Sequence, residues 1–296
     1  MKYATANAFR TALEQRLLTR TTETSIPLIR LRKLVVFDRL IARLMVVAPD
    51  RWVLKGAVAL QFRAGLQYRT TKDVDFGRRD SEQAATADFL AAQSVDLGDY
   101  FSFAIEREGT IDLEGGEAAI RYHARAELAG RLFESFVIDV GFRDSPDAPD
   151  MLRGPDLLEF AEIAPMEVPV EPLEQHVAEK VHAYTGVYAG GRPSSRVKDL
   201  VDLALIASLF TLRAERLSRA IESTFANRNT RPPQAFPRPP AQWRVAYRKM
   251  ATEAGLDEDI AKGYEQAQRL LDPVLGGALP HDSTWDPATQ AWRAAG

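Results

Sequence analysis

The sequence predicts an α+β fold in which a mixed β-sheet follows a helical N-terminal segment and precedes a largely helical C-terminal half. Three observations predict this class. Apolar residues follow the helical period from about 5 to 48, short β-type segments dominate from 49 to 145, and the helical period returns from 174 onward. We expect a first domain at 1–170, a helical domain at 171–280 and a loosely held tail at 281–296.

The N-terminal segment shows the helical period before the pattern changes. Phe9, Leu13 and Leu17 recur every four residues, and a second apolar series runs from Leu34 to Leu44. The expected strands lie at 52–54, 74–76, 101–108, 118–125 and 135–142. The expected helices between them lie at about 57–65 and 81–94. The last three strands follow one another closely, so we expect them to be neighbours that pair antiparallel.

The C-terminal half repeats the helical pattern several times. The expected helices lie at 174–189, 195–210, 213–226, 240–253 and 257–272. The proline-rich stretch TRPPQAFPRPP, residues 230–240, interrupts this series. Because proline lacks the N–H donor and fixes φ, this stretch is expected to be an extended connector.

Composition narrows the function classes. The 296 residues include no cysteine, which excludes a disulfide framework, a cysteine-ligated zinc site and a thiol nucleophile. The four histidines are scattered, so a histidine-based metal site is not expected. A metal, if used, should be held by oxygen. The formal net charge of −3 argues against coating of nucleic acid but is compatible with a local basic groove. No apolar run approaches a membrane span, and the N-terminus lacks a signal-peptide core. We expect a cytoplasmic protein, monomeric and without a membrane partner.

Asp73 and Asp75 form the first candidate site. Side chains alternate along a strand, so the two carboxylates project together while Val74 and Phe76 point into the core. Like charges in one small volume repel, and a hard divalent cation with oxygen ligands relieves that repulsion. The alternative is a strand end exposed to water.

A third acid, Asp139, lies in the apolar strand ESFVIDVGF. A carboxylate in such a strand needs a partner because an unpaired buried charge is costly. If this strand lies beside the one that carries Asp73 and Asp75, three carboxylates converge, as suits Mg²⁺ ions in phosphoryl or nucleotidyl transfer. The alternative is a salt bridge between Asp139 and a neighbouring arginine.

Two lysines complete the candidate set. Lys55 and Gly56 lie between a strand and a helix, where backbone N–H groups can meet a phosphate, although a strand-to-helix glycine can also be only a turn residue. Lys180 lies within an apolar helical stripe and must find an anion. That anion is either a phosphate of a substrate or a carboxylate such as Asp199 or Asp202.

These motifs together resemble a known family. KGA with its apolar helix, RTTKDVDF, the strand acid, EKVHAYTG and RVKDLVDL occur here in the order of the AbiEii/AbiGii nucleotidyltransferase toxins, over about residues 50–210. The resemblance implies a DNA polymerase β-like nucleotidyltransferase domain with helical additions, Mg²⁺-dependent use of NTPs, and a cognate antitoxin. In the mycobacterial type it implies addition of nucleotides to tRNA 3′ ends, which blocks aminoacylation.

The resemblance also implies roles for individual residues. It makes Asp73 and Asp75 the metal pair, Lys180 the phosphate-contacting lysine and Asp202 the later acid, although helical phase alone favours Asp199. Thr71 matches a hydroxyl that some antitoxins of the family phosphorylate. The family usually has Gly-Gly or Gly-Ser after the first strand, whereas Gly56 is followed here by Ala57, which bears on nucleotide preference.

The expected function is transfer of NMP from an NTP to an RNA acceptor, with the tRNA 3′ end as the expected site. Arginines outside the acidic pocket should bind RNA phosphates, and the candidates are Arg192, Arg196, Arg228 and Arg231. Two alternatives remain at this point. One is a nucleotide-binding regulatory protein on the same fold, and the other is a kinase-like phosphotransferase.

Overall fold

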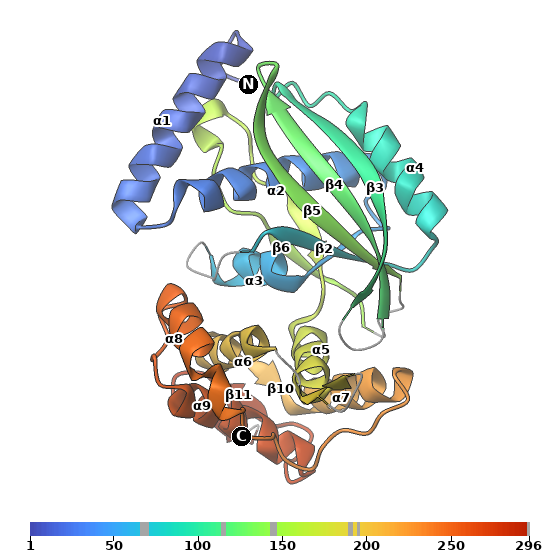
Figure 1. Ribbon diagram of the computed structural model, residues 1–296, viewed down its shortest axis with the longest axis vertical. Coiled ribbons are helices and arrows are strands. Elements are labelled where there is room, and N and C mark those ends of the chain that lie inside the picture. Colours follow the sequence, from blue (N-terminus) through green and yellow to red (C-terminus); the bar gives the residue numbers. More distant parts are fainter. Residues whose placement is uncertain (66–70, 114–116, 143–146, 189–191, 194–195, 295–296) are drawn as a thin grey trace. The chain divides into compact units, whose positions relative to one another are not determined.

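The computed structural model of the chain describes residues 1–65, 71–113, 117–142, 147–188, 192–193 and 196–294 (Figure 1). The chain divides into two compact units, the first formed by most of residues 1–171 and the second mainly by residues 172–296. Among the described helices, none combines the length and the apolar character that a membrane span requires.

Two helices begin the first unit, α1 (Ala6–Thr24) and α2 (Leu28–Val47). Helix α1 ends where Ser25 takes the left-handed conformation at φ 60°, and α2 begins after Pro27. Helix α1 buries only Phe9, Leu13 and Leu17, on one stripe. Helix α2 is buried along most of its length, so it lies inside the first unit rather than on its surface.

A seven-stranded mixed sheet forms the centre of the first unit, with strand order β3-β4-β5-β2-β1-β7-β6. The strands are β1 (Val53–Lys55), β2 (Asp73–Arg78), β3 (Phe101–Leu113), β4 (Glu117–Leu128), β5 (Arg131–Phe142), β6 (Asp150–Arg153) and β7 (Glu167–Val170). Strand β2 runs parallel to β5 and antiparallel to β1, and β1 runs parallel to β7. The predicted mixed sheet is confirmed, although β6 and β7 were not predicted.

Helices α3 (Gly56–Ala64) and α4 (Glu82–Gln93) follow β1 and β2, as predicted. Strands β4 and β5 pair antiparallel through a two-residue turn, Ala129 and Gly130, which have φ values of 54° and 67°. Two left-handed residues give the twist that a tight hairpin requires. A bulge next to Ala126 and Glu127 shifts the register of this pair by one residue.

The main core lies on one face of this sheet. Phe37 of α2 contacts Phe136 of β5 edge to face, with ring centroids 5.1 Å apart. Phe89 of α4 contacts Tyr122 of β4 at 4.7 Å, so both helices cover the same face (Figure 1). Residues of β5 that alternate with Phe136, among them Asp139, therefore point to the other face.

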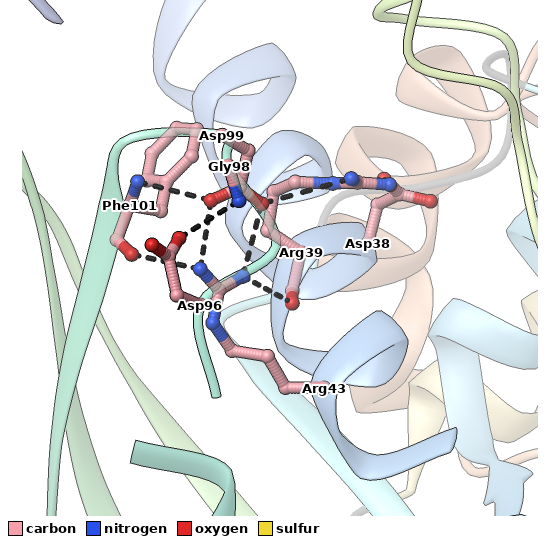
Figure 2. A network of polar contacts seen from close by, with 7 residues as sticks. All are labelled: Asp38, Arg39, Arg43, Asp96, Gly98, Asp99 and Phe101. Atoms are coloured by element: carbon pink, nitrogen blue, oxygen red, sulfur yellow. Dashed lines mark hydrogen bonds and ion pairs between the residues drawn. The ribbon is translucent and has the colours of Figure 1, made fainter. Parts of the chain in front are cut away.

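A buried polar network ties α2 to the segment before β3 (Figure 2). Arg43 donates to both carboxylate oxygens of Asp99, at 3.0 and 2.7 Å, and to the carbonyl of Phe101 at 2.7 Å. Arg39 binds Asp38 and lies 3.7 Å from Asp99. Because each buried charge has a partner of opposite sign, this network fixes where α2 meets the sheet.

Among its described residues, the second unit contains five longer helices. They are α5 (Leu173–Thr185), α6 (Val197–Leu209), α7 (Ala214–Asn227), α8 (Arg244–Glu253) and α9 (Ile260–Leu275). A two-stranded hairpin, β8 (Val187–Tyr188) with β9 (Arg192–Pro193), follows α5. The proline-rich stretch 230–240 contains no helix or strand, as predicted.

The C-terminal segment differs from the expected loose tail at 281–296. It forms β11 (Thr284–Asp286) and β12 (Ala291–Arg293), which pair with each other and with β10 (Leu212–Arg213). Trp285 is fully buried and donates its indole N–H to the carbonyl of Ala207 at 2.8 Å. Trp292 donates to the carbonyl of Leu270 at 2.9 Å. The polar sequence of this segment gave no sign of its two anchoring tryptophans, of which Trp285 is buried and Trp292 half-buried, each with its N–H hydrogen-bonded.

Candidate active site

A row of four charged residues crosses four neighbouring strands of the first unit. Lys55 of β1 is the register partner of Asp75 of β2, Asp75 is the partner of Asp139 of β5, and Asp139 is the partner of Arg121 of β4. Residues directly opposite one another lie on the same face of a sheet. The charges along this row are therefore positive, negative, negative and positive, on the face away from α2 and α4.

Asp73 lies two residues before Asp75 on the same strand, so both carboxylates point to this face and are half-buried. The hydroxyl of Thr71, which is buried, donates to the Oδ1 atom of Asp73 and approaches its carbonyl oxygen at 3.2 Å. Thr71 thus orients the Asp73 side chain at the point where the strand begins. Asp73 and Asp75 thus lie on one face of β2, as the alternation predicts.

Gly56 lies against the carboxylate of Asp75. Its φ of 63° is in the left-handed region, and a Cβ at this position would stand 1.8 Å from the Oδ2 atom of Asp75. The backbone of the β1–α3 junction therefore approaches the acid more closely than any side chain would permit. Ala57, the next residue, is buried at the start of α3.

Lys55 extends from this junction toward Glu171. The Nζ atom of Lys55 lies 3.0 Å from the Oε1 atom of Glu171, a buried residue that follows β7. The lysine stem lies close over Gly77, where a Cβ would come within 3.0 Å of the Lys55 Cδ atom. Glu171 also donates its backbone N–H to the carbonyl of Leu54 at 2.9 Å, so the acid is fixed to the same strand as the lysine.

Asp139 is bound by an arginine. Arg121 donates from Nε to Oδ1 at 2.8 Å and from Nη2 to Oδ2 at 2.7 Å, a two-point contact with a buried carboxylate. Hydrogen bonding to Asp139 raises the pKa of Arg121 above its usual value. The arginine salt bridge left open for Asp139 from the sequence is present. Within the described residues, no three acid, histidine or cysteine side chains are grouped so that they could hold a metal ion.

The second unit holds the other predicted charges. The Nζ atom of Lys180 on α5 lies 2.5 Å from the Asp202 carboxylate and 3.3 Å from that of Asp199, both on α6. Arg196 binds Asp199 at 2.6 Å. Asp199 and Asp202 are fully buried and Lys180 nearly so. Lys180 therefore has carboxylate partners, and Asp199 is shared between two cations.

The four arginines predicted for RNA lie in different surroundings. The side chain of Arg192 is outside the described residues. Arg196 is engaged with Asp199, and Arg228 is half-buried at the C-terminal end of α7. Arg231 is exposed at the start of the proline-rich stretch.

Two residues of the charged surroundings, Arg121 and Glu171, were not predicted. Arg121 was visible as a charge in the strand AAIRYHAR, but only the register of β4 against β5 shows that it meets Asp139. Glu171 lies in EPLEQ, before α5, and nothing in that pattern indicates that it contacts a lysine more than one hundred residues earlier. The first contact depends on the register of the β4–β5 hairpin, and the second on the pairing of β1 with β7, which are distant in sequence.

Comparison with known proteins agrees with this architecture. Among solved structures, MenT4, a nucleotidyltransferase toxin from Mycobacterium tuberculosis H37Rv, is similar over 92% of this chain and 99% of its own, with 20% identity and a TM-score of 0.54. This likeness concerns the fold. A nucleotidyltransferase described from H. pylori (17% identity, 85% and 97% coverage, TM-score 0.43) and JHP933 from Helicobacter pylori (15%, 83% and 91%, 0.44) are more distant and carry no inference. A search of curated protein sequences gave no significant match.

The sequence itself provides the assignment. Residues 39–289 match the family described as the nucleotidyl transferase AbiEii toxin of type IV toxin–antitoxin systems. The matched range includes the charged row of the first unit and the Lys180 group of the second. The chain therefore belongs to the AbiEii family of nucleotidyltransferase toxins.

Proposed function

We propose that this toxin transfers a nucleoside monophosphate from an NTP to an RNA acceptor, at the 3′ end of tRNA. The observation that carries the proposal is the pair Asp73 and Asp75, half-buried on one face of β2, with the Gly56 backbone against Asp75. Family membership supports the transferase class. A tRNA extended beyond its acceptor end could not be aminoacylated, which accounts for toxicity through translation.

The donor atoms suit a divalent cation. Asp73 and Asp75 offer partly accessible carboxylate oxygens, the ligands that Mg²⁺ prefers, and Mg²⁺ keeps several waters or phosphate oxygens in its shell. Asp139 would join them only after releasing Arg121. A bound Mg²⁺ would supply charge neutralisation at the phosphates and orient them.

The proposed chemistry is an in-line displacement. The RNA 3′ oxygen loses its proton and bonds to the α-phosphorus of the NTP, while the bond to the β-phosphate breaks and pyrophosphate leaves. Lys55 and the N–H groups at Gly56 and Ala57 would bind phosphate oxygens where α3 begins. We assign Lys180 to stabilising charge on the triphosphate and Asp202 to positioning Lys180.

The remaining proposals concern partners. A cognate antitoxin would oppose the toxin, and Thr71, which binds Asp73, is the hydroxyl where phosphorylation would disturb the site. For the RNA phosphates we propose Arg192, Arg196, Arg228 and Arg231, of which Arg231 is exposed. We propose that the toxin acts in the cytoplasm as a monomer.

The test is incubation of the full chain with total tRNA, Mg²⁺ and each labelled NTP in turn. Wild type should label tRNA and release pyrophosphate. Asp73→Asn removes one ligand charge with little change of shape, so incorporation should fall by about 100-fold or more while the protein stays folded. Asp50→Asn, an exposed aspartate of the same unit, is the matched control and should behave as wild type.

The products separate the alternatives. Release of NDP with transfer of the γ-phosphate would indicate a kinase-like phosphotransferase. NTP binding without turnover would indicate a regulatory protein. Substantial incorporation by Asp73→Asn would contradict the assignment of the metal pair.

A further inference from the structure

Arg121 has a place in the site that the family assignment does not give it. It lies on β4 directly opposite Asp139, and its two-point contact uses both carboxylate oxygens of that acid. Its side chain is 32% exposed, whereas that of Asp139 is 6% exposed. The arginine therefore closes the outer side of a carboxylate that is otherwise enclosed by the sheet.

The strand on the other side of Asp139 carries another acid. Asp75 is the register partner of Asp139, so the two acids lie side by side on adjacent strands, whose backbones are about 4.8 Å apart. Asp73 lies two residues from Asp75 on the same face. Three acids thus face one region of the sheet, but Asp139 is withdrawn from the group by its arginine.

We propose that Arg121 is a positioning residue that neutralises Asp139 in the metal-free protein and competes with a divalent cation for this carboxylate. The proposal rests on the proposed function, in which Asp73 and Asp75 hold the cation. With a cation on that pair, Asp139 would be the third acid able to bind it, provided that Arg121 releases the carboxylate. The charge of Asp139 is compensated in both states.

The physical reason is the cost of a bare buried carboxylate. Asp139 is 5% exposed, so water cannot replace Arg121 as its partner. A cation that takes Asp139 must therefore displace a charge-assisted hydrogen-bonded pair. Without Arg121, the cation would no longer compete with an arginine for Asp139. The Asp139 carboxylate would then gain a charged partner only when the cation binds.

The first experiment measures Mn²⁺ binding to the full chain by calorimetry or by electron paramagnetic resonance. Arg121→Gln should bind Mn²⁺ about tenfold more tightly than wild type, because one hydrogen-bonded charge pair is worth about one tenfold step in an equilibrium constant. Arg125→Gln is the matched control. Arg125 lies four residues along on the same face, is exposed, and opposes Ser135 rather than an acid. It should leave Mn²⁺ affinity close to wild type.

The second experiment measures thermal unfolding, with EDTA or with Mn²⁺. In EDTA, Arg121→Gln should melt below wild type because Asp139 has lost its partner. Mn²⁺ should raise the melting temperature of this variant more than that of wild type. The double variant Arg121→Gln/Asp139→Asn lacks both charges, so it should recover stability in EDTA and lose the additional Mn²⁺ response.

The outcomes distinguish this inference from the proposed function. If wild type binds no Mn²⁺, or if Asp73→Asn binds Mn²⁺ as tightly as wild type does, the metal pair of the proposed function is wrong. The inference about Arg121 is then wrong as well, because it depends on that pair. If Asp73→Asn abolishes binding but Arg121→Gln binds no more tightly than Arg125→Gln, only the role of Arg121 is overturned. Should Arg121→Gln fail to fold, Arg121→Lys takes its place and should show the same order of affinities, because a lysine cannot make the two-point contact.

Discussion

Gly56 is subject to two separate constraints at the scale of the single residue. Its backbone takes φ 63°, which an L-residue adopts at a cost of about 1 kcal/mol, and its missing side chain leaves room for the carboxylate of Asp75. Gly65, at the other end of α3, has φ 79° and ψ −168°, a conformation that glycine alone adopts readily, but a Cβ there would meet no atom of the described residues within 4 Å. Both glycines are therefore required by the backbone, and only at Gly56 would a side chain also meet a candidate site residue.

Replacing each glycine by alanine should separate these effects. Gly65→Ala should lower the free energy of unfolding by about 2 kcal/mol through backbone strain alone and leave transfer intact. Gly56→Ala should cost about 3 kcal/mol, because overpacking against Asp75 adds to the backbone strain. It should also reduce transfer by about 100-fold, since a displacement near 1 Å in a site has effects of that size. Urea unfolding and the labelled-NTP assay measure the two quantities.

Equal activity of the two variants would show that Asp75 has no need of the Gly56 approach. If only Gly65→Ala lost activity, the C-terminal end of α3, and not the Gly56 junction, would be the part that the reaction requires.

At the scale of the element, α6 is buried on nearly every side, which explains why sequence phase could not choose between its two acids. The helical phase of apolar residues indicates which face of a helix meets the core only when the opposite face is polar. In α6 both Asp199 and Asp202 are fully buried, and the contacts distinguish them instead. Asp202 lies nearer Lys180, whereas Asp199 divides its oxygens between Arg196 and Lys180.

Asparagine variants of the two acids should therefore fail in different ways. Asp199→Asn weakens contacts to two cations and should lose more stability, about 2–3 kcal/mol, while retaining part of the transfer activity. Asp202→Asn should lose less stability but reduce transfer by about 100-fold, because Lys180 loses its nearer partner.

Melting temperatures and initial rates of incorporation, measured on the same preparations, provide the comparison. Transfer lost only in Asp199→Asn, with Asp202→Asn near wild type, would reverse the assignment.

The sequence predicted helices and strands correctly where the apolar residues kept a regular period over a long segment. Helix α2, the three long strands and most of the C-terminal helices agree with the predicted ranges within a few residues. Strands β6 and β7 were not predicted because each is only four residues long, and β7 also contains Pro169, which is atypical of a strand. Short elements are defined by what they pair with, and pairing is not local information.

At the scale of the whole molecule, each unit is completed by residues distant in sequence. Glu171 and β7 join the sheet of the first unit beside β1. In the second unit, β11 pairs with β10, and Trp285 fills the space beside α6. The candidate carboxylates Asp73 and Asp75 could be read from alternation alone, whereas the partners Arg121 and Glu171 could not, because strand order decides them.

Trp285 allows a test of the second unit. Trp285→Ala removes a fully buried indole and its hydrogen bond to Ala207, so the free energy of unfolding should fall by about 3–5 kcal/mol. Val245→Ala, at a site that is 82% exposed on α8, should change it by less than about 0.5 kcal/mol. Urea unfolding followed by tryptophan-independent circular dichroism measures both. Equal stability of the two variants would show that the C-terminal strands contribute little.

The bulge between β4 and β5 has a consequence for how the chain folds. Counted from the tight turn without the bulge, Arg121 would oppose Ile138 and Asp139 would oppose Ile120. That frame would bring charged groups against the helices and apolar groups into water. A hairpin paired in that register would separate Asp139 from Arg121, so we expect it to be less stable than the bulged hairpin. The arginine–carboxylate contact of the candidate site would therefore also favour the correct register while the chain folds.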